Sequence, residues 1–514
     1  MSQARERWPP LPLHILPDEQ GPPHHWRAPS RERKSFMTVV ADSRLEMYLS
    51  GARVPAHSQA AIDVIDPATE EVIGHIADGD ATDVDRAVRA ASDALPAWRE
   101  LTPAQRAGFL RAIADEFERR IDEMSELVSR QNGTPIALAG AMQAMVPENY
   151  RYFASLADAL ETRERRATVG GDAIITREPV GVVGAIVPWN GPQPLTAWKV
   201  GPALAAGCTV VLKPAPETSL DALLLTEVFD AVGLPPGVIG VVTGGRQTGA
   251  ALVEHPTVRK IAFTGSAAAG KAIAATCGAG LKHVTLELGG KSAGILLDDV
   301  DLDSFRPFVL SACTPNTGQT CRALTRVLAP RARYEEVVQF LADALRAIPL
   351  GSPSDPANLY GPLVNAAQRE RVEAYIRIGV EEGAEVVTGG GRPAGFNCGY
   401  YVEPTLFRNV TNDMRIAREE IFGPVIAVMP YDTIDEAVAI ANDSEYGLGG
   451  GVFSPDVERA TAVAERIESG TVGVNTATFP MDAPFGGIKN SGLGTELGPH
   501  ALDPYLTYKT IFRP

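Results

Sequence analysis

The chain has few cysteines, and their spacing is not that of a disulfide or zinc framework. Five cysteines occur in 514 residues with no CxxC pair: Cys208, Cys277, Cys313, Cys321 and Cys398. Disulfide-stapled domains and structural zinc sites both need closely spaced cysteines. We therefore expect no metal and no disulfide. A reducing compartment fits best, which favours a cytoplasmic location.

The sequence also lacks long apolar runs and an excess of positive charge. No segment approaches the roughly 18 consecutive apolar residues that cross a bilayer. Lys and Arg number 47 against 63 Asp and Glu, so the formal net charge is -16. Negative charge of this size repels the phosphates of nucleic acids. We therefore expect neither nucleic acid nor a membrane as a partner.

The first 36 residues differ in texture from the rest of the chain. They hold seven prolines, five arginines and one lysine, and no apolar segment of signal-peptide type. This composition predicts a disordered N-terminal extension over residues 1–36, with globular sequence from Met37 onward.

Two amphipathic helices are expected before residue 134. Thr82, with Asp85 three residues on, has the spacing of a capping box and precedes apolar residues at helical intervals. A second helix is expected after Thr102-Pro103, running on toward Gly133.

From residue 181 onward, short β-branched runs alternate with helical segments. Strands are expected over residues 181–187, 209–212, 238–242, 260–263 and 284–286, and helices over 195–206, 219–232, 247–254 and 267–277. Such alternation indicates βαβ units and a parallel sheet. Ligands of parallel sheets bind at the carboxyl ends of the strands, where Asn190, Lys213 and Ser266 fall.

A second alternating region follows Cys321. Strands are expected over residues 326–328 and 425–429, and helices over 334–347 and 366–382. This pattern predicts a second α/β domain.

Gly265 begins a GxxxxGK match that ends at Lys271. Ala272 stands where a P-loop needs Ser or Thr to ligate magnesium, so ATP hydrolysis is disfavoured. Free amides at a helix start also suit the pyrophosphate of a dinucleotide. A plain tight turn is the alternative.

Four residues carry candidate chemistry. Cys321, after Gly318 and Gln319, is a candidate thiol nucleophile, with a small buried hydrophobe as the alternative. Glu287, at a strand end, is a candidate general base or an ordinary surface glutamate. Asn190, after Pro188-Trp189, offers an amide to an oxyanion or merely belongs to a loop. Lys213 binds ribose or phosphate, or is a solvated strand end.

The sequence from roughly Leu45 to Lys509 resembles the aldehyde dehydrogenase superfamily. Seven motifs occur in family order: Pro188-Trp189-Asn190, Lys213-Pro214, Phe263-Thr264-Gly265-Ser266, Glu287-Leu288-Gly289-Gly290-Lys291, Gly318-Gln319-Thr320-Cys321, Glu420-Ile421-Phe422-Gly423-Pro424 and Pro484-Phe485-Gly486-Gly487.

The resemblance implies how an aldehyde would be oxidised. Cys321 attacks the carbonyl carbon, and Asn190 with the Cys321 amide holds the oxyanion. Glu287 activates the water that releases the carboxylic acid. Lys199 and Glu496 match a pair that passes the proton from the base.

The resemblance also implies NAD as the cofactor, with NADP as the alternative, and a small-molecule aldehyde as the substrate. The cofactor-binding residues expected from it are Val187, Pro188, Trp189, Lys213, Pro216, Glu217, Gly265, Ser266, Leu288, Gly289, Glu420 and Phe422. The substrate-pocket residues expected from it are Gly191, Trp198, Thr320, Arg322, Phe479 and Phe485.

The implied fold is α/β and aldehyde dehydrogenase-like. A Rossmann-like cofactor domain would comprise residues 37–157 and 180–288, and an α/β catalytic domain residues 289–490. A small β oligomerisation element would comprise residues 158–179 and 491–514. Through that element we expect a homodimer or homotetramer.

Four positions depart from the family pattern. Pro216 stands where many relatives have a ribose-binding glutamate, and Glu217 follows it, so NAD is expected but the barrier against NADP is weakened. Gly191 and Gly473 replace common aromatics, and Arg322 directly follows the nucleophile. These changes suggest a wide entrance and a bulky or aromatic aldehyde. Arg322 would point to solvent, meet a polar end of the substrate or pair with a nearby acid.

Other functions fit the residues less well. A CoA-acylating relative usually lacks the hydrolytic glutamate, whereas Glu287 is present. A cysteine hydrolase needs a histidine base, and none of the eight histidines has a recognisable partnering motif. A structural role would be expected to lose Cys321 or Glu287.

Overall fold

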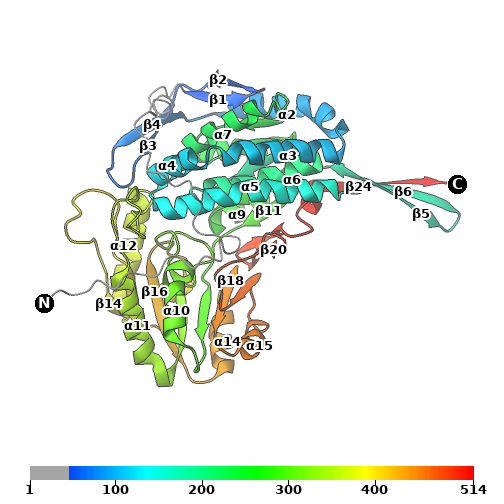
Figure 1. Cartoon of the computed structure of the whole chain (residues 1–514). Coiled ribbons are helices and arrows are strands. Elements are labelled where there is room, and N and C mark those ends of the chain that lie inside the picture. Colours follow the sequence, from blue (N-terminus) through cyan, green and yellow to red (C-terminus); the bar gives the residue numbers. More distant parts are fainter. Residues whose placement is uncertain (1–44) are drawn as a thin grey trace.

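The computed structural model describes residues 45–514. The extension expected over residues 1–36 and the boundary at Met37 lie outside the described residues. Figure 1 shows two α/β bodies, one above the other, and a slender ribbon of strands that projects to one side. The mixed α/β class expected from the sequence is confirmed.

The first body is built on an eight-stranded sheet with the order β2-β1-β9-β8-β7-β10-β11-β22. Its five central strands are parallel, as the strand and helix alternation predicts. Strands β1, β2 and β22 close its two edges in antiparallel pairs. The strands are β1 (Glu46–Leu49), β2 (Ala52–Pro55), β7 (Val182–Ile186), β8 (Thr209–Lys213), β9 (Ile239–Val241), β10 (Val258–Thr264), β11 (His283–Glu287) and β22 (Gly492–Leu493).

Helices cover this sheet, and their apolar faces pack into two buried clusters, one of which is the largest of the described chain. They are α2 (Ala81–Glu100), α3 (Pro103–Glu118), α4 (Ile121–Asn132), α5 (Ile136–Asp158), α6 (Pro192–Ala206), α7 (Ser219–Ala231), α8 (Arg246–Glu254) and α9 (Ala267–Ala279). Strands β3 (Ala61–Ile65) and β4 (Val72–Ala77) form a separate hairpin.

Two expected helix limits are wrong. The cap of α2 is Asp80 with Asp83, not Thr82 with Asp85, because the Asp80 side chain accepts from the Thr82 and Asp83 amides. The single helix expected from Pro103 to Gly133 is two helices, since the chain breaks near Arg120 before α4 begins.

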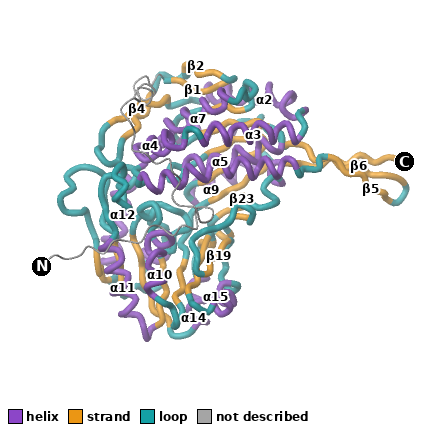
Figure 2. The backbone as a smooth tube through the Cα atoms, viewed as in Figure 1, coloured by secondary structure: helices purple, strands orange, loops and turns teal. Residues whose placement is uncertain are grey.

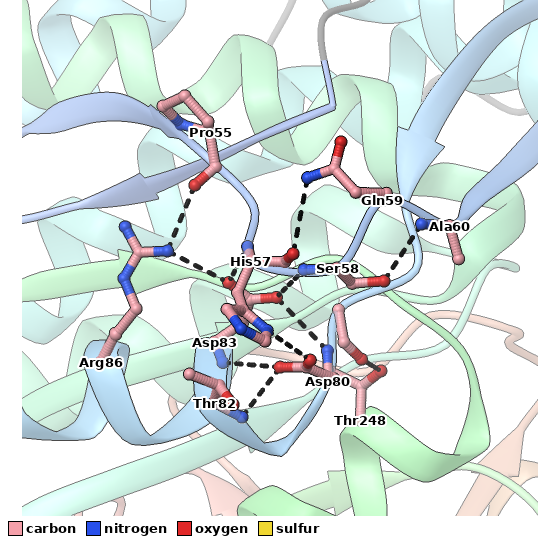
Figure 3. Close-up of polar contacts among 11 residues, drawn as sticks. Pro55, His57, Ser58, Gln59, Ala60, Asp80, Thr82, Asp83, Arg86 and Thr248 are labelled. Carbon is pink, nitrogen blue, oxygen red and sulfur yellow. Dashed lines mark hydrogen bonds and ion pairs between the residues drawn. The ribbon is translucent and has the colours of Figure 1, made fainter.

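The start of α2 also anchors the chain that precedes it. Figure 3 shows Asp80 and Asp83 facing the loop after Pro55. His57 Nδ1 lies 2.7 Å from Asp80 Oδ2, and the His57 amide donates to Asp83 Oδ1 over 2.8 Å. Arg86 donates to Asp83 and to the Pro55 carbonyl. Asp83 therefore caps a helix and holds an edge strand at the same time.

The second body contains a seven-stranded sheet with the order β14-β15-β16-β13-β12-β18-β19. All its pairs are parallel except that of the edge strand β14. The strands are β12 (Ala293–Leu296), β13 (Arg326–Pro330), β14 (Glu385–Thr388), β15 (Thr405–Arg408), β16 (Val425–Tyr431), β18 (Gly449–Phe453) and β19 (Thr471–Val474). The helices are α10 (Leu302–Phe308), α11 (Tyr334–Ala347), α12 (Ala366–Glu381), α13 (Arg415–Arg418), α14 (Ile434–Asn442) and α15 (Val457–Ala464).

The C-terminal strands divide among several sheets. β22 joins the first sheet, β21 (Ile488–Lys489) pairs with β17 (Tyr446–Gly447), and β23 (Glu496–Leu497) pairs with β20 (Pro484–Phe485). β24 (Leu506–Arg513) pairs with β6 (Gly171–Pro179), which also pairs with β5 (Arg163–Thr168). Figure 2 shows these three strands running away from both bodies. The domain limits expected from the sequence stay predictions.

Within residues 45–514, no helix is both long and apolar enough to cross a membrane.

Candidate active site

The loop that carries Cys321 has an unusual backbone. Asn316, Thr317 and Gly318 are consecutive left-handed residues with φ of 51°, 55° and 75°. Each non-glycine residue in this region costs roughly 1–2 kcal/mol. A Cβ on Gly318 would lie 2.1 Å from the Gly423 carbonyl oxygen, so only glycine fits there. Strain held by close packing of this kind is typical of functional loops.

Asn190 connects this loop to the first body. It lies just before α6, and its side-chain Nδ2 donates to the Gln319 carbonyl over 3.0 Å. Asn316 Nδ2 donates in turn to the Asn190 carbonyl over 3.2 Å. Asn132 holds the preceding residue through its bond to the Trp189 carbonyl. These bonds hold the side-chain amide of Asn190 against the backbone of Gln319, which precedes Cys321 by two residues.

Glu287 ends strand β11 in an enclosed place. It is 3% exposed, and neither of its carboxyl oxygens has a hydrogen-bond partner among the described residues. Burial, and then the nearby Glu496, raise the pKa of Glu287 well above its ordinary value, while Lys199 opposes the shift. Unpaired buried polar atoms are rare in folded proteins and point to a use in the site.

Lys199 and Glu496 form a buried ion pair close to Glu287. Lys199 Nζ lies 2.8 Å from Glu496 Oε1 and donates to Thr264 Oγ1 over 2.6 Å. The two side chains are 0% and 3% exposed. The structure thus brings Lys199, Glu496 and Glu287 into one electrostatic cluster, as the sequence predicts.

The glycines after Glu287 let two chain segments approach closely. A Cβ on Gly290 would lie 2.3 Å from the Cys321 carbonyl oxygen, and one on Gly289 would lie 2.4 Å from Glu420 Oε2. The Gly290 amide donates to Glu420 Oε1 over 3.0 Å. Burial raises the pKa of Glu420 to about 7. The segment after the candidate base therefore packs directly against the candidate nucleophile.

Cys321 is half-buried and carries a free thiol. Burial raises the pKa of Cys321 to about 12, and the charges of Glu420 and Glu287 contribute to the rise, whereas Arg322 opposes it. The thiol is thus protonated at neutral pH, and it needs a base or a nearby positive charge to become a thiolate.

The residues expected to hold a dinucleotide gather at the carboxyl ends of β7, β8, β10 and β11. Lys213 is 5% exposed, its Nζ donates to the Pro214 carbonyl, and burial lowers its pKa to about 8. Ser266 caps α9 by accepting from the Ala269 amide. The Val187 amide donates to the Lys213 carbonyl, which joins the two strand ends.

The other residues expected to bind the dinucleotide come from several segments of the chain. Trp189 and Phe422 meet edge to face with ring centroids 5.3 Å apart. The Leu288 amide donates to the Ser491 carbonyl. Gly265 packs against the Phe263 ring. Pro216 starts a short 3-10 turn that leads into α7.

Glu217 points across to the second body. Its Oε1 accepts from Asn365 Nδ2 over 3.1 Å, and Asn365 caps α12. Glu217, which follows the position of the usual ribose-binding glutamate by one residue, therefore accepts a hydrogen bond from Asn365, a contact that the sequence did not predict.

An aromatic cluster surrounds Trp198, in helix α6. The Trp198 ring is 5.7 Å from Phe479 and 5.4 Å from Phe485, and the last two rings are 5.0 Å apart. Cys321 packs against the same buried cluster of apolar side chains. Thr320 donates to the Pro315 carbonyl. The Arg322 guanidinium lies over the Phe479 ring at 4.6 Å and donates to the Ala477 carbonyl.

One of the two glycines expected to widen the entrance has a packing explanation. A Cβ on Gly473 would lie 2.3 Å from the Thr476 carbonyl oxygen, so close backbone packing accounts for that glycine. A Cβ on Gly191 would lie 3.2 Å from Met142 Cε, the end of a flexible side chain, so a small shift of that side chain would admit it. Packing therefore explains Gly473, and the wider entrance at Gly191 stays a prediction.

Several contributors were missed in the sequence. Asn132, Asn316, Thr264, Asn365 and Ser491 all hold predicted site residues through hydrogen bonds. Only Thr264 and Asn316 lie in or next to one of the sequence motifs, so only these two could have been suspected as site residues from the sequence. Within residues 45–514, no group of three or more His, Cys, Asp or Glu is placed to hold a metal ion.

A thiol, an amide donor and a buried carboxyl near the carboxyl ends of a parallel sheet are groups that can act together on an aldehyde. The sequence profile of the aldehyde dehydrogenase family matches residues 54–511, and the chain belongs to that family. The protein is therefore an oxidoreductase of the aldehyde dehydrogenase class.

Three relatives illustrate the similarity. Geranial dehydrogenase of Castellaniella defragrans is 47% identical over 91% of this chain and 98% of its own length. A Mycobacterium tuberculosis aldehyde dehydrogenase complexed with NAD+ is 45% identical, with a TM-score of 0.89 over 92% of this chain and 98% of its own. A mutant of Pseudomonas syringae aldehyde dehydrogenase C, complexed with NAD+ and octanal, is 42% identical, with a TM-score of 0.88 over 91% and 96%.

Proposed function

We propose that the protein oxidises an aldehyde to its carboxylic acid through a thioester on Cys321, with NAD+ as the oxidant. The observation that supports this most is the buried Glu287 carboxyl, which no donor of the described residues engages. It lies three residues before Gly290, whose backbone packs on the Cys321 carbonyl. A free buried carboxyl beside a thiol is suited to hydrolyse a thioester.

In the first step, Cys321 Sγ bonds to the aldehyde carbon and the carbonyl π electrons move to oxygen. The thiol proton passes to a water molecule and leaves with it, and Glu287 acts only in the later hydrolysis. The oxyanion accepts from Asn190 Nδ2 and from the Cys321 amide. For this, Asn190 exchanges its present acceptor, the Gln319 carbonyl, for the substrate oxygen.

In the second step, the carbon loses its hydrogen as hydride, the C=O bond reforms and the acyl group stays on Cys321 as a thioester. NAD+, when bound, supplies the acceptor of that hydride. Water then attacks the thioester while Glu287 takes its proton, and Cys321 leaves with its electron pair. Aldehyde, NAD+ and water thus give acid, NADH and a proton.

Lys199 and Glu496 receive the proton that Glu287 collects. Glu496 lies close enough to shift the pKa of Glu287, and its Oε2 is itself without a hydrogen-bond partner among residues 45–514. A carboxyl that holds one oxygen free beside a lysine can accept and pass on a proton.

The residues at the sheet edge fit a dinucleotide. The buried Lys213 Nζ donates to one backbone carbonyl, which leaves donors for ribose hydroxyls. The first amides of α9 after Gly265 and Ser266 suit a pyrophosphate. Glu420 accepts from the Gly290 amide through Oε1, which leaves Oε2 for the second ribose. Phe422 and Trp189 form a wall for the nicotinamide.

We propose NAD rather than NADP as the cofactor. Glu217 contributes negative charge near Lys213, and together with Asp78 it opposes a 2′-phosphate. The two solved relatives described above are complexes with NAD+. Comparing kcat/KM for the two cofactors tests this, and a preference for NADP above about tenfold would refute it.

We propose an aldehyde with a bulky body as the substrate. The apolar rings of Trp198, Phe479 and Phe485 support this, as do relatives named for geranial or complexed with octanal. The direct test is NADH formation at 340 nm across an aldehyde panel. If acetaldehyde outperforms every larger aldehyde, the bulky substrate is wrong.

We further propose that residues 158–179 and 491–514 serve oligomerisation of a cytoplasmic enzyme. The projecting strands expose Tyr508, Ile511 and Phe512, at 63%, 45% and 77%, and exposed apolar groups of this kind favour association. All five cysteines carry free thiols, as a reducing compartment permits. Light scattering on a Phe512→Asp variant tests the first point, since the substitution should lower the mass, and an unchanged oligomer would count against it.

A further inference from the structure

Arg322 is a charged side chain with no carboxylate partner. It directly follows Cys321, and no ion pair joins it to an acidic residue among residues 45–514. Its contacts are the Ala477 carbonyl and the face of the Phe479 ring. Arg322 is half-buried, and this partial burial lowers the pKa of its guanidinium. One expectation was that Arg322 pairs with a nearby acidic residue. Within the described residues, this expectation is wrong.

A cavity of about 350 Å³ opens beside this arginine. Most of its wall is apolar or glycine, including Leu324, Val472 and Phe479, and Thr476 and Thr478 add hydroxyl groups. Among the lining residues, all within the described part of the chain, Arg322 is the only charged one. A cavity with a partly apolar, partly hydroxyl-bearing wall and a single cation suits a ligand with an apolar body and an anionic end.

The cavity adjoins the proposed aldehyde site through Phe479. That ring meets Trp198 and Phe485, and Arg322 lies over its face. The Trp198 indole is buried, and its Nε1 has no hydrogen-bond partner in the described chain. Because Arg322 and Cys321 are adjacent, with Cα atoms about 3.8 Å apart, the guanidinium is tied to the nucleophile. The charge of Arg322 also acts on the thiol, since it opposes the rise in the pKa of Cys321.

We propose that Arg322 is a specificity residue that binds a carboxylate at the far end of the aldehyde substrate. The inference rests on the proposed function, and it adds a substrate class to it, aldehydes that carry a carboxylate beyond an apolar body. Arginine suits this role because its guanidinium presents several donors in one plane to a carboxylate. Nη2 donates to the Ala477 carbonyl, and Nε and Nη1 have no hydrogen-bond partner within residues 45–514.

The test compares 4-formylbenzoate with its methyl ester, methyl 4-formylbenzoate, as substrates of the full-length enzyme. The two share the ring and the aldehyde and differ in the negative charge. We expect kcat/KM of the acid to exceed that of the ester by about tenfold or more. Equal values, or a preference for the ester, would overturn the proposal.

Variants of Arg322 test whether this residue causes the preference for the acid over the ester. In Arg322→Met the ratio of acid to ester should collapse to about one, and Arg322→Lys should keep part of it, since lysine retains charge without the planar fork. Arg369→Met is the matched control, because Arg369 likewise lies over a ring, that of Tyr400, and donates to the Gly399 carbonyl. The control should keep the ratio, and a collapse there as well would contradict a specific role.

Two further arms distinguish substrate recognition by Arg322 from a site for free carboxylates and from a failure of the oxidation itself. With octanal as substrate, added 4-methylbenzoate should inhibit competitively against octanal in the wild type and not in Arg322→Met, whereas noncompetitive inhibition would mean a separate site for free carboxylates and would count against the proposal. If no aldehyde yields NADH, the proposed function itself fails. If octanal and the ester are oxidised but the acid is not preferred, only the role of Arg322 fails.

Discussion

Asn190 Nδ2 donates to the carbonyl oxygen of Gln319 across 3.0 Å, which joins the start of α6 to the loop of the nucleophile. Asn316 returns a bond to the Asn190 carbonyl, so the two segments hold each other. The donor proposed for the oxyanion is therefore held beside the loop of the nucleophile, where it would exchange the Gln319 carbonyl for the substrate oxygen. A donor at that place would stabilise the charge that develops on the substrate oxygen.

Replacing Asn190 with Ala should lower kcat by about 10²-fold with a smaller change in KM, because the lost donor acts mainly on the developing charge. Steady-state NADH formation measures both constants. Asn490→Ala is the control, since Asn490 bonds Glu445 at the surface. A rise in KM with an unchanged kcat in Asn190→Ala would argue against an oxyanion role.

Replacing Glu287 with Gln should slow turnover by about 10²–10⁴-fold, because deacylation loses its general base. The first turnover should remain visible as a burst of NADH in stopped-flow absorbance. Glu335→Gln, at an exposed carboxyl, should behave as the wild type. Unchanged steady-state turnover in Glu287→Gln would mean that another group activates the water.

Replacing Gly290 with Ala should abolish most activity and destabilise the fold, since the new methyl would meet the Cys321 carbonyl oxygen at 2.3 Å. Gly108→Ala is the matched control in helix α3, where no described atom outside the neighbouring residues and the helix's own backbone lies within 4 Å of the added methyl. That change should stabilise the protein by about 0.5–1 kcal/mol. Activity assays and thermal unfolding of both variants make the comparison, and normal activity of Gly290→Ala would refute the close contact.

Replacing Lys199 with Met should cost about 3–5 kcal/mol of stability, because Glu496 would stay buried without its partner. The double variant Lys199→Met/Glu496→Gln should regain most of that loss. Urea unfolding of the two single variants, the double variant and the wild type forms the cycle. Additive effects of the two substitutions would show that the ion pair is energetically unimportant.

Asp221 predicts a pH dependence of stability. It is buried between Gln131 and Gln193, whose side-chain amides donate to it, and burial raises its pKa from 3.8 to about 7. The folded state then binds the proton more tightly than the unfolded state. The contribution of Asp221 to stability is complete below about pH 4 and is lost as the pH rises through about 7.

Compared with Asp221→Asn, the wild type should lose up to about 1.4 kcal/mol of unfolding free energy per pH unit over that interval. Urea unfolding at several pH values measures the difference. Asp343→Asn, at an exposed carboxyl, is the control and should show no such trend. A difference between wild type and Asp221→Asn that does not vary with pH would contradict the raised pKa.

The alternation between residues 181 and 287 was predictable because each parallel strand there is a short apolar run with a helix after it. The last strand residues, Lys213 and Glu287, followed from the same pattern. Helix α5 was not predicted, since its sequence is rich in alanine and contains Pro147, so its apolar period is weak. The glycine-rich strand β18 was missed for lack of β-branched residues at its start.

The partners of the site residues could not be predicted, because they depend on contacts between distant segments. Asn365 reaches Glu217 across 148 positions, and Ser491 reaches Leu288 from the C-terminal region. At Gly473 the sequence led to a wrong prediction, because the absence of a side chain was interpreted as open space. Its Cβ position is filled by the Thr476 carbonyl, which only the folded backbone reveals.

One mass measurement tests most directly whether Cys321 carries the acyl group and whether Glu287 is the base that releases it. It is the intact mass of Glu287→Gln after incubation with octanal and NAD+, followed by peptide mapping. We predict a gain of one octanoyl group located on Cys321, with none in Cys321→Ala/Glu287→Gln. An unmodified mass while NADH is formed, or an acyl group on another residue, would contradict these two roles.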